Sequence, residues 1–307
     1  MCALPKHNAI CSNDRCFRGV GVSMSESVGL RATKLADPES GPDIPVIFLY
    51  PSTSAAVLTQ LGPYELEVAA DGEPATSVKG VVLISHGSGS TPLVYRNLGW
   101  GLAQAGYLVA LPEHPGNNRN DNSLADSAEI LLNRPRHLSI VLDHLEGTAR
   151  SGGLGRVVVI GPSMGGYTAL ALAGGRPKTP SGEAVATRTD PRIGGLVLLA
   201  PATPWFAGAG ALQAVRVPVM MRTAEYDPHT PAWQADIVRN GLSAQTPLDD
   251  QEVENAGHFS FLSVFPASMA QPGFDPATDP PGFDRAAYER QLASEVLSFI
   301  AGVLATV

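Results

Sequence analysis

The fold is decided by the stretch Val157-Val158-Val159-Ile160-Gly161-Pro162-Ser163-Met164-Gly165-Gly166. Its four β-branched residues in a row predict a buried strand, and the apolar run at residues 169–173 predicts a buried helix. Between them, Gly161-x-Ser163-x-Gly165 is the pattern of a nucleophile elbow, where a strand turns sharply into a helix and exposes a serine hydroxyl. Glycines suit this turn because side chains would collide where strand and helix cross. We expect Ser163 to be a catalytic nucleophile.

The glycine and serine pattern is a weak signal when it stands alone. The chain holds 32 glycines among 307 residues, so short glycine patterns also arise by chance. A plain turn between a strand and a helix would use the same residues. The rest of the chain must therefore supply the partners that a nucleophilic serine needs.

The composition is that of a globular protein with a buried core. Hydrophobic residues make up 44% of the chain and charged residues 16%, which are ordinary globular values. A length of 307 residues suffices for one large α/β domain. The formal net charge of −8 argues against nucleic acid or an anionic membrane as a partner.

The N-terminal segment differs from the rest of the chain. All three cysteines, Cys2, Cys11 and Cys16, lie there; the last two could form a bridge, but their odd number and position favour incidental thiols. This segment lacks the basic and apolar regions of a signal peptide, and no run of 18 apolar residues predicts a transmembrane helix. We expect a cytoplasmic protein with a flexible tail over residues 1–19 and a single α/β domain over residues 20–307.

Short apolar runs separated by helical segments predict a mostly parallel sheet of about eight strands, with helices on both faces. The strands are expected at residues 44–51, 64–69, 80–85, 107–111, 157–160, 195–200, 217–221 and 251–254. Further helices are expected at residues 94–105, 135–150, 231–240 and 284–303, and the second of them is expected to begin at Pro135. Cap-like insertions that cover the site in part are expected at residues 112–134, 176–192, 202–214 and 262–284.

A nucleophilic serine needs a histidine base, and that base needs a carboxylate to orient it. Behind a nucleophile elbow the order is serine, acid, histidine. Downstream of Ser163 the histidines are His229 and His258, and we favour His258 because it follows a short predicted strand. The acid is expected on the loop that holds Glu225 and Asp227. We favour Asp227 because the strand has ended there and the chain turns at a proline.

An oxyanion that develops during acyl transfer needs two backbone N–H donors already in place. One is expected from Met164, directly after the nucleophile. The other is expected from the glycine-rich loop His86-Gly87-Ser88-Gly89, where Gly87 and Ser88 are equally suitable. His86 itself is expected to order this loop.

Specificity is expected to depend on side chains over the carboxyl edge of the sheet. The candidates are Leu93, Tyr95, His114, Asn117, Trp205 and Phe206. Trp205 and Phe206 could equally pack a cap segment. No metal-ligand spacing is present, so we expect neither a metal nor an organic cofactor. The sequence indicates no oligomeric state.

With these residues the chain resembles the α/β-hydrolase superfamily over about residues 20–305. Within it, the chain is similar to dienelactone-hydrolase-like proteins, which are related to the platelet-activating-factor acetylhydrolases. The resemblance is carried by Ile44-Pro45-Val46, Tyr50-Pro51, His86-Gly87-Ser88-Gly89, Glu113-His114-Pro115-Gly116, Arg134-Pro135, Gly161-Pro162-Ser163-Met164-Gly165-Gly166 and Gly257-His258-Phe259. It implies an α/β-hydrolase fold.

Two positions depart from that branch. Dienelactone hydrolases use cysteine at the elbow, so Ser163 does not imply lactone chemistry. Pro162 stands where such hydrolases often have another side chain, which stiffens the turn. We expect a serine esterase that cleaves a small or medium soluble ester through an acyl-enzyme, with Ser163, Asp227 and His258 as its triad. The alternatives are an amidase or peptidase with the same triad, or a binding protein without catalysis.

Overall fold

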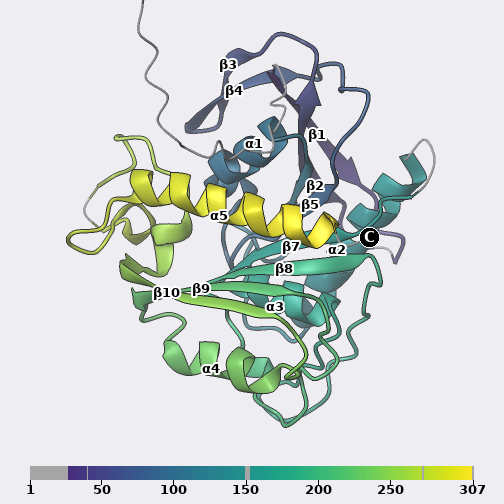
Figure 1. Cartoon of the computed structure of the whole chain (residues 1–307), viewed down its shortest axis with the longest axis vertical. Helices are drawn as coiled ribbons and strands as arrows, with labels where there is room; N and C mark the ends of the chain where they lie inside the picture. Colours follow the sequence, from purple (N-terminus) through teal and green to yellow (C-terminus); the bar gives the residue numbers. More distant parts are fainter. Residues whose placement is uncertain (1–26, 40, 149–152, 272, 306–307) are drawn as a thin grey trace, which may run out of the picture.

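A computed structural model of the protein describes residues 27–39, 41–148, 153–271 and 273–305. Within these residues, ten strands form one sheet in the order β10-β9-β8-β7-β5-β6-β2-β1-β4-β3 (Figure 1). The strands are β1 (Ser27–Leu35), β2 (Ile44–Ser52), β3 (Val57–Leu61), β4 (Tyr64–Ala70), β5 (Val81–Ile84), β6 (Leu108–Pro112), β7 (Val157–Pro162), β8 (Ile193–Leu199), β9 (Val219–Tyr226) and β10 (Leu248–Gly257).

The half of the sheet from β6 to β10 is parallel throughout. Its central strands β5, β7 and β8 are buried along their whole length, because helices cover both faces of a parallel sheet. The carboxyl ends of parallel strands lie at one edge, so the loops after β5, β7, β9 and β10 gather there. This edge positions every residue that the sequence singles out for acyl transfer.

The sheet has two more strands than the sequence predicts, namely β1 and β3. β1 pairs antiparallel with β2 and parallel with β4, while β3 pairs antiparallel with β4 at the edge of the sheet. β1 is buried from Val28 to Leu30 but exposed at Arg31 and Lys34, and no residue of β3 is buried. Such half-exposed strands lack the continuous apolar run that marks a parallel strand.

Helices cover both faces of the sheet, as predicted. They are α1 (Arg96–Gln104), α2 (Glu129–Thr148), α3 (Met164–Leu172), α4 (Ala232–Gly241) and α5 (Arg285–Ala305), with the short 3-10 helices η1 (Pro92–Tyr95), η2 (Pro204–Phe206), η3 (His258–Phe261) and η4 (Asp275–Ala277). Residues of α1 and α5 share one apolar core with Val158 and Ile160 of β7, whereas α2, α3 and α4 share the other with Val157 and Val159. In Figure 1, α5 is the yellow helix that crosses in front of the sheet.

Helix α2 begins at Glu129, not at Pro135 as the sequence analysis expects. Pro135 lies inside the helix, where it lacks the N–H that would bond to the carbonyl of Leu131. That freed carbonyl accepts a hydrogen bond of 2.8 Å from the hydroxyl of Tyr167 on α3. The proline is tolerated in the interior because a neighbouring side chain satisfies the backbone, and the same bond ties α2 to the helix of the elbow.

Two further expectations concern the termini and membranes. The tail expected at residues 1–19 lies outside the described residues. No helix in the described part of the chain combines the length and apolar character needed to cross a membrane. The strands from Ser27 to Gly257 share one sheet, and α5 packs on it through Leu292, Val296 and Ile300.

Candidate active site

The turn between β7 and α3 has the geometry of a nucleophile elbow. Ser163 has a backbone φ of 51° and ψ of −120°, a strained conformation for a residue with a side chain. A Cβ on Gly161 would lie 2.2 Å from the carbonyl oxygen of Gly165, and one on Gly165 would lie 1.8 Å from that of Ser85. No side chain fits at these separations, so both glycines are needed for strand and helix to approach this closely.

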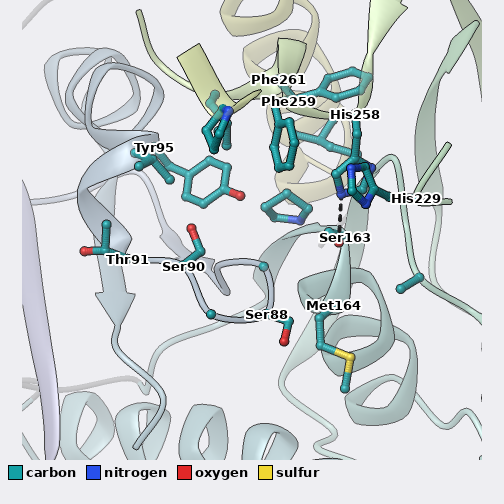
Figure 2. Close-up of a pocket in the computed structure, with 18 of the residues that line it drawn as sticks. Ser88, Ser90, Thr91, Tyr95, Ser163, Met164, His229, His258, Phe259 and Phe261 are labelled. Atoms are coloured by element: carbon teal, nitrogen blue, oxygen red, sulfur yellow. Dashed lines mark hydrogen bonds between the residues drawn. The ribbon is translucent and has the colours of Figure 1, made fainter. Parts of the chain in front are cut away.

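Three side chains from three loops form a hydrogen-bonded chain at the carboxyl edge of the sheet. Ser163 Oγ lies 3.1 Å from His258 Nε2, and His258 Nδ1 lies 2.7 Å from Asp227 Oδ2. Figure 2 shows His258 directly above Ser163, with the first of these bonds dashed. His258 follows β10, and Asp227 follows β9. With Nδ1–H donated to the carboxylate, Nε2 can accept the serine proton.

Asp227 is held by donors on every side. Its Oδ1 accepts the backbone N–H groups of His229 and Thr230, each at 2.8 Å, and its Oδ2 also accepts the hydroxyl of Thr230 at 2.6 Å. Burial raises the pKa of Asp227, but hydrogen bonds from His258 and Thr230 outweigh it and hold the pKa below its usual range. The carboxylate is therefore ionised at neutral pH and fixed in direction toward the imidazole.

The two alternative residues, Glu225 and His229, do not take part in this hydrogen-bonded chain. Glu225 is exposed and accepts the backbone N–H of Asn255 at 2.8 Å. His229 lines the same cavity, and its ring centroid lies 4.9 Å from that of His258, but it has no hydrogen bond to Ser163. The structure thus brings His258 and Asp227, rather than His229 and Glu225, to the serine.

Two backbone segments lie beside Ser163. The N–H of Met164 is the first of α3 and has no acceptor within the helix. Gly87 and Ser88 line the same cavity, and a Cβ on Gly87 would lie 3.4 Å from the Cβ of Ser163. These are the groups that the sequence suggests as oxyanion donors.

Arg134 is a buried cation beneath this loop, and its side-chain partners are all uncharged. Its guanidinium donates to Asn117 Oδ1 at 2.7 Å, to Thr168 Oγ1 on α3 at 2.9 Å and to Ser85 Oγ at 3.2 Å, and it also bonds to the carbonyl of His86. Burial lowers the pKa of Arg134 to about 9, so it remains charged at neutral pH. Arg134 joins α3 to the glycine-rich loop over residues 86–90, which we call the oxyanion loop after the role that the sequence predicts for it.

Three buried imidazoles, which we call the histidine trio (His86, His114 and His137), lie beside that cation. His86 Nδ1 donates to the carbonyl of Gly87 at 2.7 Å, while its Nε2 accepts the backbone N–H of His114 at 3.1 Å. Burial, and next the charge of Arg134, lower the pKa of His86 to about 3. His137 is lowered to a pKa of about 3 by burial and the Arg136 charge, and the pKa of His114 falls well below its usual value. The trio is neutral and orders the loop.

A cavity of about 640 Å³ lies over Ser163, within the size range of sites for small molecules. Three of the four predicted insertions contribute to its wall: 112–134, 202–214 and 262–284. The insertion at 176–192 does not reach this cavity. These insertions follow β6, β8 and β10, so the wall of the cavity is formed by loops from across the parallel half of the sheet.

Only some of the predicted specificity residues reach the cavity. Tyr95 and Trp205 line it, but Leu93, His114, Asn117 and Phe206 do not. His114 belongs to the buried trio, and Asn117 donates to Ser88 Oγ at 2.9 Å and to Asn122 Oδ1 at 2.8 Å. Phe206 is 2% exposed and stacks on Tyr167, as the packing alternative suggests. His114 and Asn117 thus hold the loop at residues 86–88 from below, and neither they nor Phe206 line the cavity.

Most of the apolar wall comes from residues other than those that the sequence suggests. Phe259, Phe261, Phe265 and Phe274 line the cavity, and Figure 2 shows the first two beside His258. The signal was present, because residues 259–274 hold four of the nine phenylalanines of the chain. Asp279 fixes this segment by accepting Ser260 Oγ and Arg285 Nε, each at 2.8 Å.

No group of three or more metal-ligating side chains is positioned to hold a metal ion within the described residues. The buried imidazoles bond to one another, to hydroxyls and to the backbone instead. The arrangement allows Ser163 to transfer its proton to His258 in a cavity with an apolar wall.

Comparisons with known proteins agree with this fold. Residues 76–253, more than half of the chain, match the family described as serine aminopeptidase, S33. The ferulic acid esterase from Streptomyces cinnamoneus has a similar structure, with a TM-score of 0.62 and 18% identity over 89% of this chain and 90% of that one. A predicted CIB-like hydrolase from Thermoplasma acidophilum gives a TM-score of 0.52 and 14% identity over 88% and 98%. These structures share the α/β-hydrolase fold.

Proposed function

Since the chain belongs to the serine aminopeptidase S33 family of hydrolases, we propose that it is a serine esterase that cleaves carboxylic esters of small or medium size. The observation that carries this function is the hydrogen-bonded chain from Ser163 through His258 to Asp227 at the wall of the cavity. The dienelactone-hydrolase-like branch stays a prediction, and esterase activity does not depend on it.

The reaction begins when Ser163 Oγ attacks the ester carbonyl while its proton passes to His258 Nε2. The ionised carboxylate of Asp227 stabilises the imidazolium that forms. His258 then gives the proton to the leaving alkoxide, and the acyl group remains on the serine as an ester. Water, deprotonated by the same imidazole, releases the acid and restores the serine.

The tetrahedral oxyanion is stabilised by the N–H groups of Met164 and Ser88. We favour Ser88 over Gly87 because the hydroxyl of Tyr95 lies next to Gly87, 3.8 Å from where its Cβ would be, and competes for its N–H. Donors aimed at the developing charge contribute more to catalysis than any other single feature of such sites.

Ester hydrolysis fits the cavity better than aminopeptidase activity. An aminopeptidase must hold the α-ammonium group of its substrate, for which a carboxylate is the strongest partner. Among the described residues that line the cavity, none is an aspartate or a glutamate. The wall instead offers aromatic rings, including Tyr95, Trp205 and Phe261, which suit an apolar acyl or alcohol group.

A panel of p-nitrophenyl esters of rising chain length, run beside the matching p-nitroanilides, tests this function. We expect kcat/KM for each ester to exceed that of its anilide. The S163A variant is the control and should lose turnover of every member. Anilide rates above ester rates would establish an amidase instead, and the absence of turnover from the whole panel in the wild-type protein would favour a binding protein.

A further inference from the structure

Arg119 places a positive charge at the mouth of the cavity that holds Ser163. Its side chain is exposed and makes neither an ion pair nor a hydrogen bond with the described residues. Many other arginines of the chain are bound to carboxylates. These are Arg31, Arg136, Arg192, Arg222, Arg239 and Arg285. The guanidinium at the cavity is therefore free to bind a ligand.

The backbone that carries Arg119 is held firmly in place. Its N–H donates to the carbonyl of Ser90 on the oxyanion loop at 2.8 Å. The buried side chain of Asn118 accepts the N–H groups of Asn120 and Asp121 and donates to the carbonyl of His114 at 2.9 Å. The backbone of Arg119 therefore has a fixed position relative to the serine, and its side chain starts from a defined point at the cavity.

Polar side chains accompany Arg119 in the cavity without a negative charge beside them. Ser90 and Thr91 line it, and their hydroxyls make no hydrogen bond within the described part of the chain. Figure 2 shows both residues across the cavity from His258 and Ser163, with Tyr95 above Ser90. A substrate can thus place its ester at the serine and a second polar group at this end.

We propose that Arg119, together with Ser90 and Thr91, binds a carboxylate carried by the ester substrate, so that the enzyme prefers anionic esters to neutral esters of the same size. This specificity rests on the proposed ester hydrolysis at Ser163. The apolar wall then holds the chain between the scissile carbonyl and the carboxylate.

The negative net charge of the protein supports a role for Arg119 in binding an anionic substrate. A chain with a formal charge of −8 repels anions over most of its surface, so an anionic substrate needs a local cation. A guanidinium binds a carboxylate through two parallel N–H donors, and hydrogen bonds to charged groups contribute about 1.5–3 kcal/mol. Converted at 1.36 kcal/mol per tenfold change, this predicts a preference of about tenfold to a hundredfold in kcat/KM.

The experiment compares mono-p-nitrophenyl esters of adipic, pimelic and suberic acids with the same compounds whose far carboxylate is a methyl ester. A second arm places the carboxylate on the leaving group, as in 4-carboxyphenyl hexanoate against its methyl ester. The two arms establish whether the acyl side or the alcohol side carries the charge. We expect an anionic preference of about tenfold or more in at least one arm.

Substitution of Arg119 tests the residue itself. In R119Q the ratio of anionic to neutral kcat/KM should fall about tenfold or more, and R119E should invert the preference, while R119K should retain part of it. R290Q, which removes an exposed arginine from α5 outside the cavity, is the matched control and should keep the wild-type ratio. An equal fall in R290Q would indicate a general charge effect and overturn the assignment.

The role of Arg119 and the esterase activity can be disproved independently of each other. Turnover of the neutral esters with no anionic preference in either arm would overturn the role of Arg119 and leave the esterase intact. An anionic preference that persists in R119E would also overturn it. Failure to hydrolyse any ester, neutral or anionic, would overturn the proposed function itself.

Discussion

Two groups of histidines in this protein show how surroundings decide what an imidazole can do. His258 lies at the cavity, 2.7 Å from the carboxylate of Asp227 and 3.1 Å from the hydroxyl of Ser163. The histidine trio is buried beside the cation Arg134, with hydroxyls, backbone groups and other imidazoles as its partners. The same side chain thus meets an anion in one place and a cation in the other.

The charge beside each group of histidines determines its role. A carboxylate stabilises a protonated imidazole, which is the form a general base must reach during proton transfer. A buried guanidinium opposes protonation, so the trio stays neutral and serves as fixed donors and acceptors beneath the oxyanion loop. We infer that one group performs proton transfer and that the other holds its geometry.

The largest expected effect comes from removing the anion beside His258. The D227N variant keeps the shape of the side chain but favours the wrong imidazole tautomer, so kcat on a p-nitrophenyl ester should fall by about four orders of magnitude. E225Q, which alters an exposed carboxylate near the same loop, is the matched control. A comparable loss in E225Q with little change in D227N would show that the acid has been assigned to the wrong residue.

A smaller loss is expected when the cation beneath the oxyanion loop is removed. In R134M the carbonyl of His86 and the amide oxygen of Asn117 lose a donor, and each buried acceptor without a partner costs about 1–3 kcal/mol. The melting temperature should fall, and kcat should fall about a hundredfold as the loop loses its position. R134K should recover part of the activity.

R290M removes an exposed arginine from α5 and serves as the control for R134M. If R134M melts earlier but retains the wild-type kcat, the guanidinium supports stability alone and does not position the loop.

The low pKa values of the trio should make the free energy of unfolding depend on pH. The pKa of His137 is about 3 in the folded protein against 6.5 for an ordinary histidine, so the unfolded chain binds one more proton between these values. The contribution of the neutral His137 to the free energy of unfolding is fully present above pH 6.5 and is lost as the pH falls toward 3. Urea unfolding of H137Q should show a slope shallower by up to about 1.4 kcal/mol per pH unit in this window.

H144Q is the matched variant, since His144 lies exposed on the same helix. It should keep the wild-type slope. A slope of H137Q equal to that of the wild-type protein would contradict a buried neutral imidazole at this position.

The smallest effect is expected at the exposed neighbour of the base. His229 contacts His258 only through its ring, at a centroid separation of 4.9 Å, so H229A should lower kcat/KM by no more than about threefold. Loss of several orders of magnitude in steady-state assays would assign proton transfer to His229 and remove the contrast between the two groups.

The sequence predicts the elbow because contiguous residues encode it. Glycines at Gly161 and Gly165 are required by contacts below 2.5 Å, and the order of serine, acid and histidine follows the order of parallel strands. Asp227 and His258 each follow a strand directly, so their place at the carboxyl edge could be inferred without knowledge of the loops.

The wall of the cavity could not be predicted in the same way. His114 stands in a loop at the correct edge, but Arg134, from the next helix, encloses it together with the rest of the trio. The phenylalanines after His258 line the cavity in a segment that Asp279 holds through Ser260 and Arg285, residues distant from one another in the sequence. Strands β1 and β3 could not be predicted because many of their residues are exposed, so their sequences lack a continuous apolar run.

The most direct measurement is labelling by a fluorophosphonate probe, which reacts with an activated serine. Intact mass and peptide mapping should place one adduct on Ser163 in the wild-type protein. H258A and D227N should be labelled far more slowly, whereas H137Q should be labelled at nearly the wild-type rate. Labelling that persists in S163A, or that does not slow in H258A, would contradict the central claim that His258 activates Ser163.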